Sequence, residues 1–111
     1  WAIRCGDSTY AAGDARQNAS QCHGLCGNGE LFIELARITK DESWTQRARE
    51  FGHLAANYSE GEIPNRRWRS DEPGAYSPDF MMGASGVGHY FLRLARPRQI
   101  QMPLMVKPSK L

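Results

Sequence analysis

An internal repeat constrains the fold of this chain more than any other feature of its sequence. Residues 24–37 read GLCGNGELFIELAR, and residues 83–96 read GASGVGHYFLRLAR. Aligned without gaps, the two segments share their glycines and then a Phe, a Leu, an Ala and an Arg. A repeat of this kind indicates a supersecondary unit stacked on copies of itself, because one such unit rarely buries its apolar face alone.

The length and composition describe a small folded domain. A chain of 111 residues gives one domain at most. Hydrophobic residues make up 41% and charged residues 23%, which is typical of globular proteins and not of disordered ones. The net charge of +2 is too small to indicate nucleic-acid binding by itself. No stretch approaches the roughly 20 apolar residues that a membrane span needs.

The N-terminus and the cysteines favour a cytoplasmic location. The first residues, 1–4, contain no Met and lack the charged and apolar regions of a signal peptide. We therefore expect a fragment of a longer cytoplasmic protein. Three cysteines are an odd count that favours reduced thiols. We do not expect a disulfide between Cys22 and Cys26.

The repeat predicts two mostly apolar helices. The first spans residues 29–38, with Asn28 as its N-cap, and is apolar nearly all round, so we expect it to be buried on most sides. The second lies within residues 80–96 and stops at Pro97. The tail, residues 97–111, is rich in proline and is expected to be extended.

A third, amphipathic helix is predicted over residues 41–58. Ser43 and Gln46 have the spacing of a capping box. Apolar residues recur there at steps of four and three, which places them on one stripe: Trp44, Ala48, Phe51, Ala55 and Tyr58. This helix should lie on an outer layer with one face exposed. Residues 1–20 are predicted to be a loop with one short helical piece.

Residues 59–79 are predicted to be a long loop, since they are rich in Gly, Pro, Ser and charge. The loop carries the basic and aromatic cluster Arg66-Arg67-Trp68-Arg69. In the favoured interpretation, Trp68 anchors a solvated loop; in the other, the cluster binds an anionic or peptide partner. No strand pattern of comparable strength appears, so the predicted class is all-α, with inner and outer helices.

Cys22 and His23 are the candidate metal ligands. A thiolate and an imidazole are ligand types that zinc prefers, and the glycines place the pair at the start of a buried helix. Zinc needs three or four protein ligands. The spacing of the other Cys and His side chains does not complete such a site: Cys5, Cys26, His53 and His89. We expect His53 on the surface and His89 to be a hydrogen-bonded core histidine.

The glycine pattern does not indicate a nucleotide site. Gly-x-x-Gly-x-Gly reverses the glycine order of the dinucleotide-binding fingerprint, and no strand is predicted before it. No serine-centred elbow, phosphate loop or paired-carboxylate arrangement stands out.

Two motifs resemble the C-terminal part of lanthionine synthetase C-like (LanC) cyclase domains. That family has Cys-His-Gly before a glycine-rich inner helix, as in Cys22-His23-Gly24. It closes with a Gly-x-x-Gly-x-Gly segment, as in residues 83–88, and a helix that ends Leu-Arg-Leu, as in residues 92–94. The resemblance covers about residues 20–97. It makes the whole chain, residues 1–111, the C-terminal part of such a domain.

The resemblance implies an α/α toroid and a zinc-dependent reaction. In the family, zinc holds a cysteine of a precursor peptide as the thiolate, which adds to dehydroalanine or dehydrobutyrine and forms a thioether ring. Cys22 and His23 would be two of three protein zinc ligands. The implied partners are the precursor peptide and, as a candidate, an upstream dehydratase or kinase-like module.

The sequence departs from the family pattern upstream. The third zinc ligand belongs to a Trp-Cys-x-Gly motif that is absent here, as are the upstream acid–base residues, so the catalytic and substrate-binding residues are not assigned. Three functions remain open. They are lanthipeptide cyclisation, addition of glutathione to dehydroamino acids on the same fold, and a non-catalytic helical-repeat fragment that binds a peptide through residues 66–69.

Overall fold

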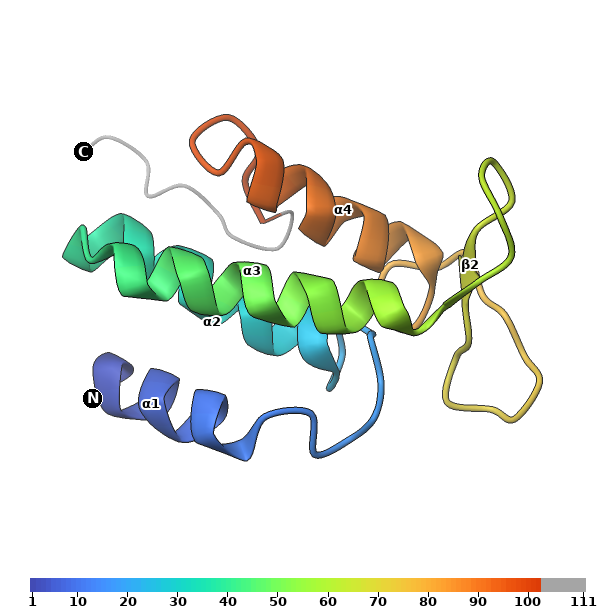
Figure 1. Cartoon of the computed structure of the whole chain (residues 1–111), viewed down its shortest axis with the longest axis horizontal. Helices are drawn as coiled ribbons and strands as arrows, with labels where there is room; N and C mark the ends of the chain where they lie inside the picture. The colour runs from blue at the N-terminus through green and yellow to red at the C-terminus, as the bar shows by residue number, and fades with distance from the viewer. Residues whose placement is uncertain (103–111) are drawn as a thin grey trace, which may run out of the picture.

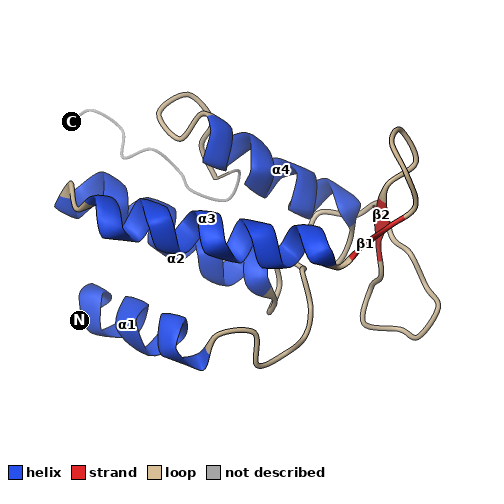
Figure 2. Cartoon of the chain, viewed as in Figure 1, coloured by secondary structure: helices blue, strands red, loops and turns tan. Residues whose placement is uncertain are grey.

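The computed structural model describes residues 1–102 and confirms the all-α class (Figure 2). The order of elements is α1 (Ala2–Ala12), α2 (Leu25–Thr39), α3 (Glu42–Asn57), β1 (Ser59–Glu60), β2 (Arg67–Trp68) and α4 (Ala84–Ala95). No helix among these residues is long and apolar enough to cross a membrane. The predicted extended tail begins with a turn at residues 97–99, and its last part, residues 103–111, lies outside the described residues.

The helices alternate in direction around α2. In Figure 1, α1 and α3 run one way, whereas α2 and α4 run the other way, and α4 begins beside the short β1–β2 hairpin. Helix α2 contacts all three other helices, as expected for a helix that is apolar on most sides. The buried core is formed mainly by α2 and α3, with additions from α4: Leu25, Cys26, Phe32, Ile33, Leu35, Trp44, Ala48, Phe51, Ala55, Val87 and Tyr90.

The two copies of the repeat fold in the same way. The backbone N–H of Leu25 donates to the Asn18 carbonyl at 2.8 Å, and that of Ala84 donates to the Ser77 carbonyl at 2.9 Å. In each copy the preceding turn lies against the first helical turn. A Cβ at any of the glycines that begin these helices would meet backbone of that turn closer than 3.0 Å: Gly24, Gly27, Gly83 and Gly86. The shared glycines therefore allow a loop to pack on a helix start.

This packing corrects the predicted helix starts. Helix α2 begins at Leu25 and not at residue 29, with Gly24 as its N-cap, so the prediction of Asn28 as the cap was wrong. Helix α4 begins at Ala84, with Gly83 in the equivalent position. The glycine-rich residues were predicted to precede the helices because glycine weakens a helix. In the structure they lie inside the helices, where the close approach of the preceding loop requires them.

The two helix starts lie side by side. The Cys22 backbone N–H donates to the Met81 carbonyl at 2.9 Å, and the Gln21 side-chain amide donates to the Gly86 carbonyl at 3.0 Å. The sequence repeat therefore corresponds to two adjacent helices, α2 and α4. The closed toroid that the family resemblance implies remains an expectation.

Helix α3 agrees closely with the prediction for residues 41–58. Its buried face is the predicted stripe up to Ala55, and its other face is exposed, as at Arg49 and His53. The predicted capping box was wrong. The cap is Asp41, whose carboxylate accepts from the Ser43 backbone N–H at 2.9 Å, while the Gln46 amide donates instead to Glu50 at 3.2 Å.

Residues 1–20 hold a longer helix than the short piece predicted. Helix α1 lies along α2 and α3, and its Gly6 is buried against Leu35 and Trp44. The Asp7 carboxylate accepts from Arg47 at 2.7 Å. Because α1 gains these contacts only when α3 is in place, its own weak apolar pattern did not reveal it.

The predicted loop of residues 59–79 contains the hairpin. Ser59 pairs with Trp68 in antiparallel register. The Trp68 indole N–H donates to the Ala55 carbonyl at 2.9 Å, and its ring packs near Phe91. The favoured interpretation of Trp68 as an anchor is therefore confirmed. Strands of two residues are too short to show an alternating pattern, which explains why the sequence did not indicate them.

Candidate metal centre

Cys22 and His23 lie in the turn that leads into α2. Two backbone hydrogen bonds fix the turn. The Gly24 N–H donates to the Ser20 carbonyl at 3.2 Å, and the Cys22 N–H donates to the Met81 carbonyl in the loop before α4. The Cys22 side chain is exposed and is not in a disulfide. The two candidate ligands therefore stand next to each other on a backbone that both repeat units support.

The His23 ring has one engaged and one free nitrogen. Its Nε2 lies 2.6 Å from Oδ2 of Asp71, whereas its Nδ1 is buried and has no hydrogen-bond partner in the described part of the chain. A buried polar atom without a partner is costly, so such an atom calls for an explanation. A metal ion bound to Nδ1 is an explanation that suits the chemistry of the ring. Metal-bound histidines commonly donate their other ring N–H to a carboxylate, a backbone carbonyl or water, and here Nε2 faces a carboxylate.

A cavity of about 400 Å³ opens beside the pair. It lies between the end of α1 and the start of α2, and is lined by residues 12–16 on one side and by Cys22, His23, Gly24, Leu25 and Asn28 on the other. The candidate ligands are thus next to a space that a small group could enter.

The donor types fit zinc, but the described residues supply only part of a site. A cysteine sulfur and a histidine nitrogen suit Zn²⁺. No group of three or more Cys, His, Asp or Glu side chains within residues 1–102 is placed to hold a metal ion. Cys22 and His23 can therefore be two ligands of a site whose remaining ligands lie outside this part of the chain.

The other candidates have different surroundings. Cys5 and His53 are exposed, and Cys26 is buried in the core, where burial raises the pKa of its thiol well above the usual range. His89 packs beside Phe80, with 5.6 Å between ring centres, and burial lowers its pKa. Neither ring nitrogen of His89 has a partner among the described residues, so the expected hydrogen-bonded core histidine was wrong in that respect.

Asp71 is the contact that the sequence did not indicate. It lies in the loop after β2, far along the chain from His23. No local spacing points to it, since the same loop also holds Glu72 and Asp79. Only the folding of that loop against the start of α2 brings the carboxylate to the imidazole.

The cluster at residues 66–69 is largely engaged within the chain. The Arg67 guanidinium lies over the Tyr76 ring, 4.1 Å from its centre, and Arg69 pairs with Glu60. Arg66 is exposed. The interactions that a peptide partner would need from Arg67 and Arg69 are therefore made inside the hairpin region.

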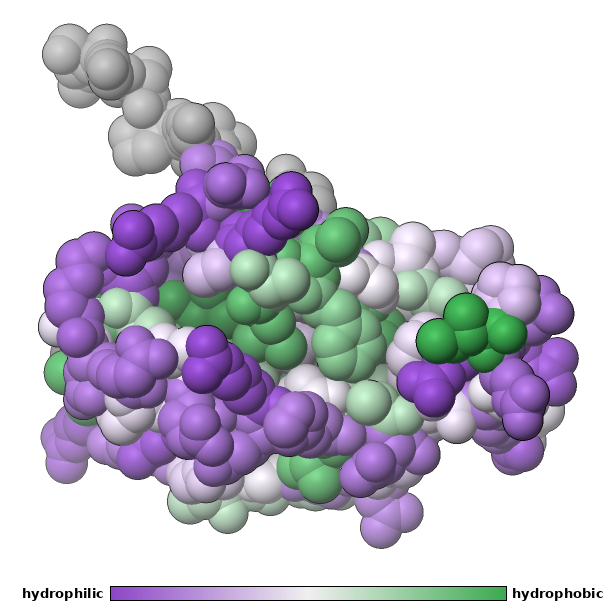
Figure 3. All heavy atoms as spheres, turned by 45° about the horizontal axis from the view of Figure 1, so that its top comes forward, coloured by the Kyte–Doolittle hydropathy of each residue, from purple (hydrophilic) through white to green (hydrophobic). Residues whose placement is uncertain are grey.

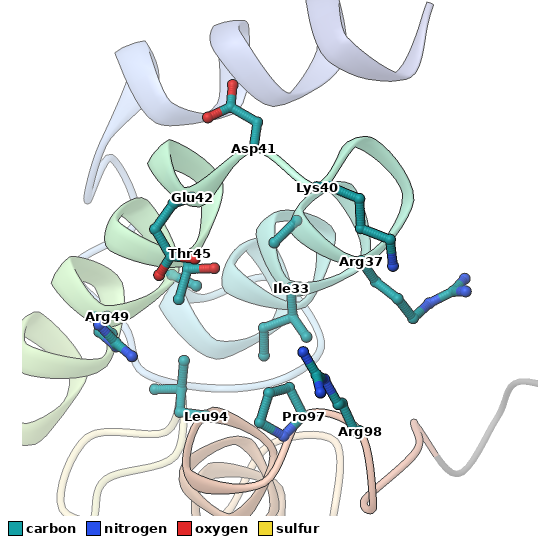
Figure 4. A pocket seen from close by; sticks show the side chains of 12 residues that line it. Ile33, Arg37, Lys40, Asp41, Glu42, Thr45, Arg49, Leu94, Pro97 and Arg98 are labelled. Atoms are coloured by element: carbon teal, nitrogen blue, oxygen red, sulfur yellow. The ribbon is translucent and has the colours of Figure 1, made fainter.

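A second cavity, of about 440 Å³, lies at the far end of α2 and carries no candidate metal ligand of the Cys or His type. The face drawn in Figure 3 has a recessed apolar area surrounded by polar residues. In the close-up of the cavity, Ile33, Leu94 and Pro97 converge on the hollow, with Arg37 and Arg49 farther out (Figure 4). Its lining shares no residue with the Cys22–His23 pair, so this cavity does not belong to the candidate metal centre.

Comparison with known proteins identifies the family of the chain. The family model of lanthionine synthetase C-like proteins matches residues 2–106. A similar curated protein is glutathione S-transferase LANCL1 of Danio rerio, which is 26% identical over 106 residues. The match covers 92% of this chain and 23% of that relative, so this chain spans under a quarter of the relative's length. On the match over nearly its whole length, this chain belongs to the lanthionine synthetase C-like protein family.

Proposed function

We propose that this chain supplies two protein ligands, the Cys22 sulfur and the His23 Nδ1 atom, to a zinc site that activates thiols in the cytoplasm. The observation that carries the proposal is the buried, unpartnered Nδ1 of His23 beside the exposed Cys22 side chain. Zinc, when bound there, would lower the pKa of a substrate thiol and so make a nucleophilic thiolate available at neutral pH. In this proposal residues 1–111 are the C-terminal part of the cyclase domain.

The reaction that we propose first is lanthionine or methyllanthionine formation. The sulfur of a precursor-peptide cysteine bonds to the β-carbon of a dehydroalanine or dehydrobutyrine, the carbon–carbon double bond opens, and the α-carbon takes up a proton. The cavity of about 400 Å³ beside Cys22 supports this proposal, because it would let a substrate side chain reach the pair. In this proposal the proton comes from the acid–base residues that the family carries upstream of this segment.

Addition of glutathione to dehydroamino acids is the second candidate function. The similarity to a protein named glutathione S-transferase LANCL1 favours it. The same bonds form and break, but the thiol comes from a separate molecule. A purely structural role with peptide binding at residues 66–69 has less support, because the Arg67 and Arg69 side chains already have partners.

The first prediction concerns metal content. The full-length protein, in which residues 1–111 are joined to the remaining ligands, should bind about one zinc ion per chain. Cys22→Ala and His23→Ala should each abolish stoichiometric binding, because zinc sites need at least three protein ligands. Elemental analysis of the purified proteins measures this. Cys5→Ser, which removes another exposed cysteine, is the control and should retain zinc. Zinc that survives in both ligand variants would contradict the assignment.

The two candidate reactions differ in the mass of the product. A dehydroalanine peptide that carries its own cysteine should lose its alkylatable thiol without a change of mass if cyclisation occurs. The same peptide without cysteine should gain the mass of one glutathione if glutathione is added.

A further inference from the structure

We propose that Asp71 is a positioning residue for His23, which holds the imidazole so that Nδ1 is presented to a metal ion. The inference rests on the proposed zinc site and assigns a role within it to the loop between β2 and α4. Its starting point is the 2.6 Å contact between Asp71 Oδ2 and His23 Nε2.

Both oxygens of the Asp71 carboxylate are engaged. Oδ2 contacts His23, and Oδ1 accepts from the side-chain amide of Asn18. The Asn18 side-chain oxygen in turn accepts from the Ser20 backbone N–H at 2.6 Å. The carboxylate is therefore tied to the turn that carries the candidate ligands, and it cannot rotate without losing one of these bonds.

The loop that carries Asp71 is itself closed. Arg69 and Tyr76 form an antiparallel bridge across it, and the Ser70 backbone N–H donates to the Ala75 carbonyl at 2.9 Å. Asp71 stands directly after the point where the loop closes. Its place against His23 follows from this closure.

The contact has a direct consequence for the imidazole. Because an ionised carboxylate only accepts hydrogen bonds, the shared hydrogen lies on Nε2, and a neutral ring then has its lone pair on Nδ1. That is the buried atom without a partner. A carboxylate that orients a metal-binding histidine through its other nitrogen is a common device in metal sites.

The exposure of the pair argues against a mainly stabilising role. The side chains are 36% and 41% exposed, and pairs that are so accessible to water add little to the stability of a protein. We therefore assign the Asp71–His23 contact to the orientation of the imidazole ring and not to the stability of the fold.

The test combines Asp71→Ala and the nearly isosteric Asp71→Asn with a matched control in the intact polypeptide. Competition with a chromogenic chelator measures Zn²⁺ affinity. We expect Asp71→Ala to weaken it by about 10- to 100-fold, and Asp71→Asn by less, since it keeps an acceptor oxygen. Glu60→Gln is the control, because Glu60 bonds to Arg69 and Tyr76 in the same region but does not contact His23. It should leave zinc affinity unchanged.

A second readout needs no metal. Nitrogen NMR of the metal-free protein should show hydrogen on Nε2 of His23 in the wild type and in Glu60→Gln, and a mixture of both ring forms in Asp71→Ala. If the other NMR signals of Asp71→Ala match those of the wild type, the variant is folded. A mixture of the two His23 tautomers then reports the lost contact and not unfolding.

The outcomes separate this inference from the proposed function. Zinc binding that Cys22→Ala and His23→Ala abolish, but that both Asp71 variants retain at full strength, would overturn the inference and leave the zinc site standing. A wild-type protein without zinc affinity would overturn the proposed function, and the role of Asp71 with it.

Discussion

At the scale of single residues, Gly29 and Gly88 occupy the same place in the repeat but have different surroundings. A Cβ on Gly29 would come closer than 3.0 Å to the Tyr90 ring, whose hydroxyl donates to the Ala48 carbonyl at 2.7 Å. A Cβ on Gly88 would meet nothing within 4 Å. The first glycine is needed for contact between α2 and α4, whereas the second has no such contact in the described residues.

Gly29→Ala should therefore destabilise the protein by about 1–3 kcal/mol, the usual cost of overpacking a filled core. Gly88→Ala is the matched control and should be neutral or stabilising by up to about 1 kcal/mol, because alanine favours a helix. Urea denaturation of the two variants measures both effects. Equal effects of the two substitutions would show that the Tyr90 contact does not govern the choice of glycine.

At the scale of an element, α3 depends on the Asp41 cap. The hydrogen bonds from Ser43 lower the pKa of the Asp41 carboxyl. The cap therefore contributes stability above the unfolded-state pKa of about 4, and that stability is lost as the pH falls through the lower folded-state pKa. Asp41→Ala should lower the urea midpoint at pH 7, and the difference from the wild type should shrink below pH 4.

Two further substitutions separate the observed cap from the predicted capping box. Ser43→Ala keeps the backbone N–H that Asp41 caps, and should lower the urea midpoint less than Asp41→Ala does. Asp41→Asn keeps an acceptor and should remove most of the pH dependence. A larger loss from Ser43→Ala would favour the capping box over Asp41.

At the scale of the whole molecule, a buried ionic cluster joins the two repeat units. The Arg93 side chain on α4 is 2% exposed. Its Nε atom lies 3.1 Å from Glu30, and its Nη2 atom lies 2.7 Å from Glu34, both on α2. Burial raises the pKa of Glu30, although the Arg93 guanidinium opposes this shift.

Arg93→Ala should cost about 3–5 kcal/mol at pH 7, because it leaves the Glu30 carboxylate buried and unpaired. The loss should be smaller at acidic pH. Below the unfolded-state pKa of about 4.3, Glu30 is neutral in both the folded and the unfolded state, so it costs the variant nothing. The stability of the variant then falls as the pH rises through the raised folded-state pKa of Glu30. Denaturation at pH 4 and pH 7 measures this dependence.

The double variant Glu30→Leu with Arg93→Met tests whether charge burial is the cause. It replaces both partners with apolar side chains, and should recover most or all of the stability. A double variant as unstable as Arg93→Ala would show that the cluster acts through shape and not through charge.

Much of the fold followed from the sequence, because it depends on residues that are close in the chain. The apolar stripe from Trp44 to Ala55 requires only the period of a helix. The adjacent Cys22 and His23 were visible as a pair of donors. The predictions failed where distant segments decide the structure, as for the helix over residues 2–12, which is stabilised by contacts with α2 and α3, and for the Gly-rich helix starts.

The sequence by itself determined the helical class, the repeat and the pair of candidate ligands. The class and the ligand pair depend on residues that are close in the chain, and the repeat is a match between two stretches of sequence that needs no contact between them. Only the tertiary structure decided that Asp71 contacts His23, that Gly29 faces Tyr90 and that Arg93 meets Glu30. The physical reason is that these contacts join segments that meet only after the helices have packed. Their strength depends on burial and geometry, which spacing along the chain does not define.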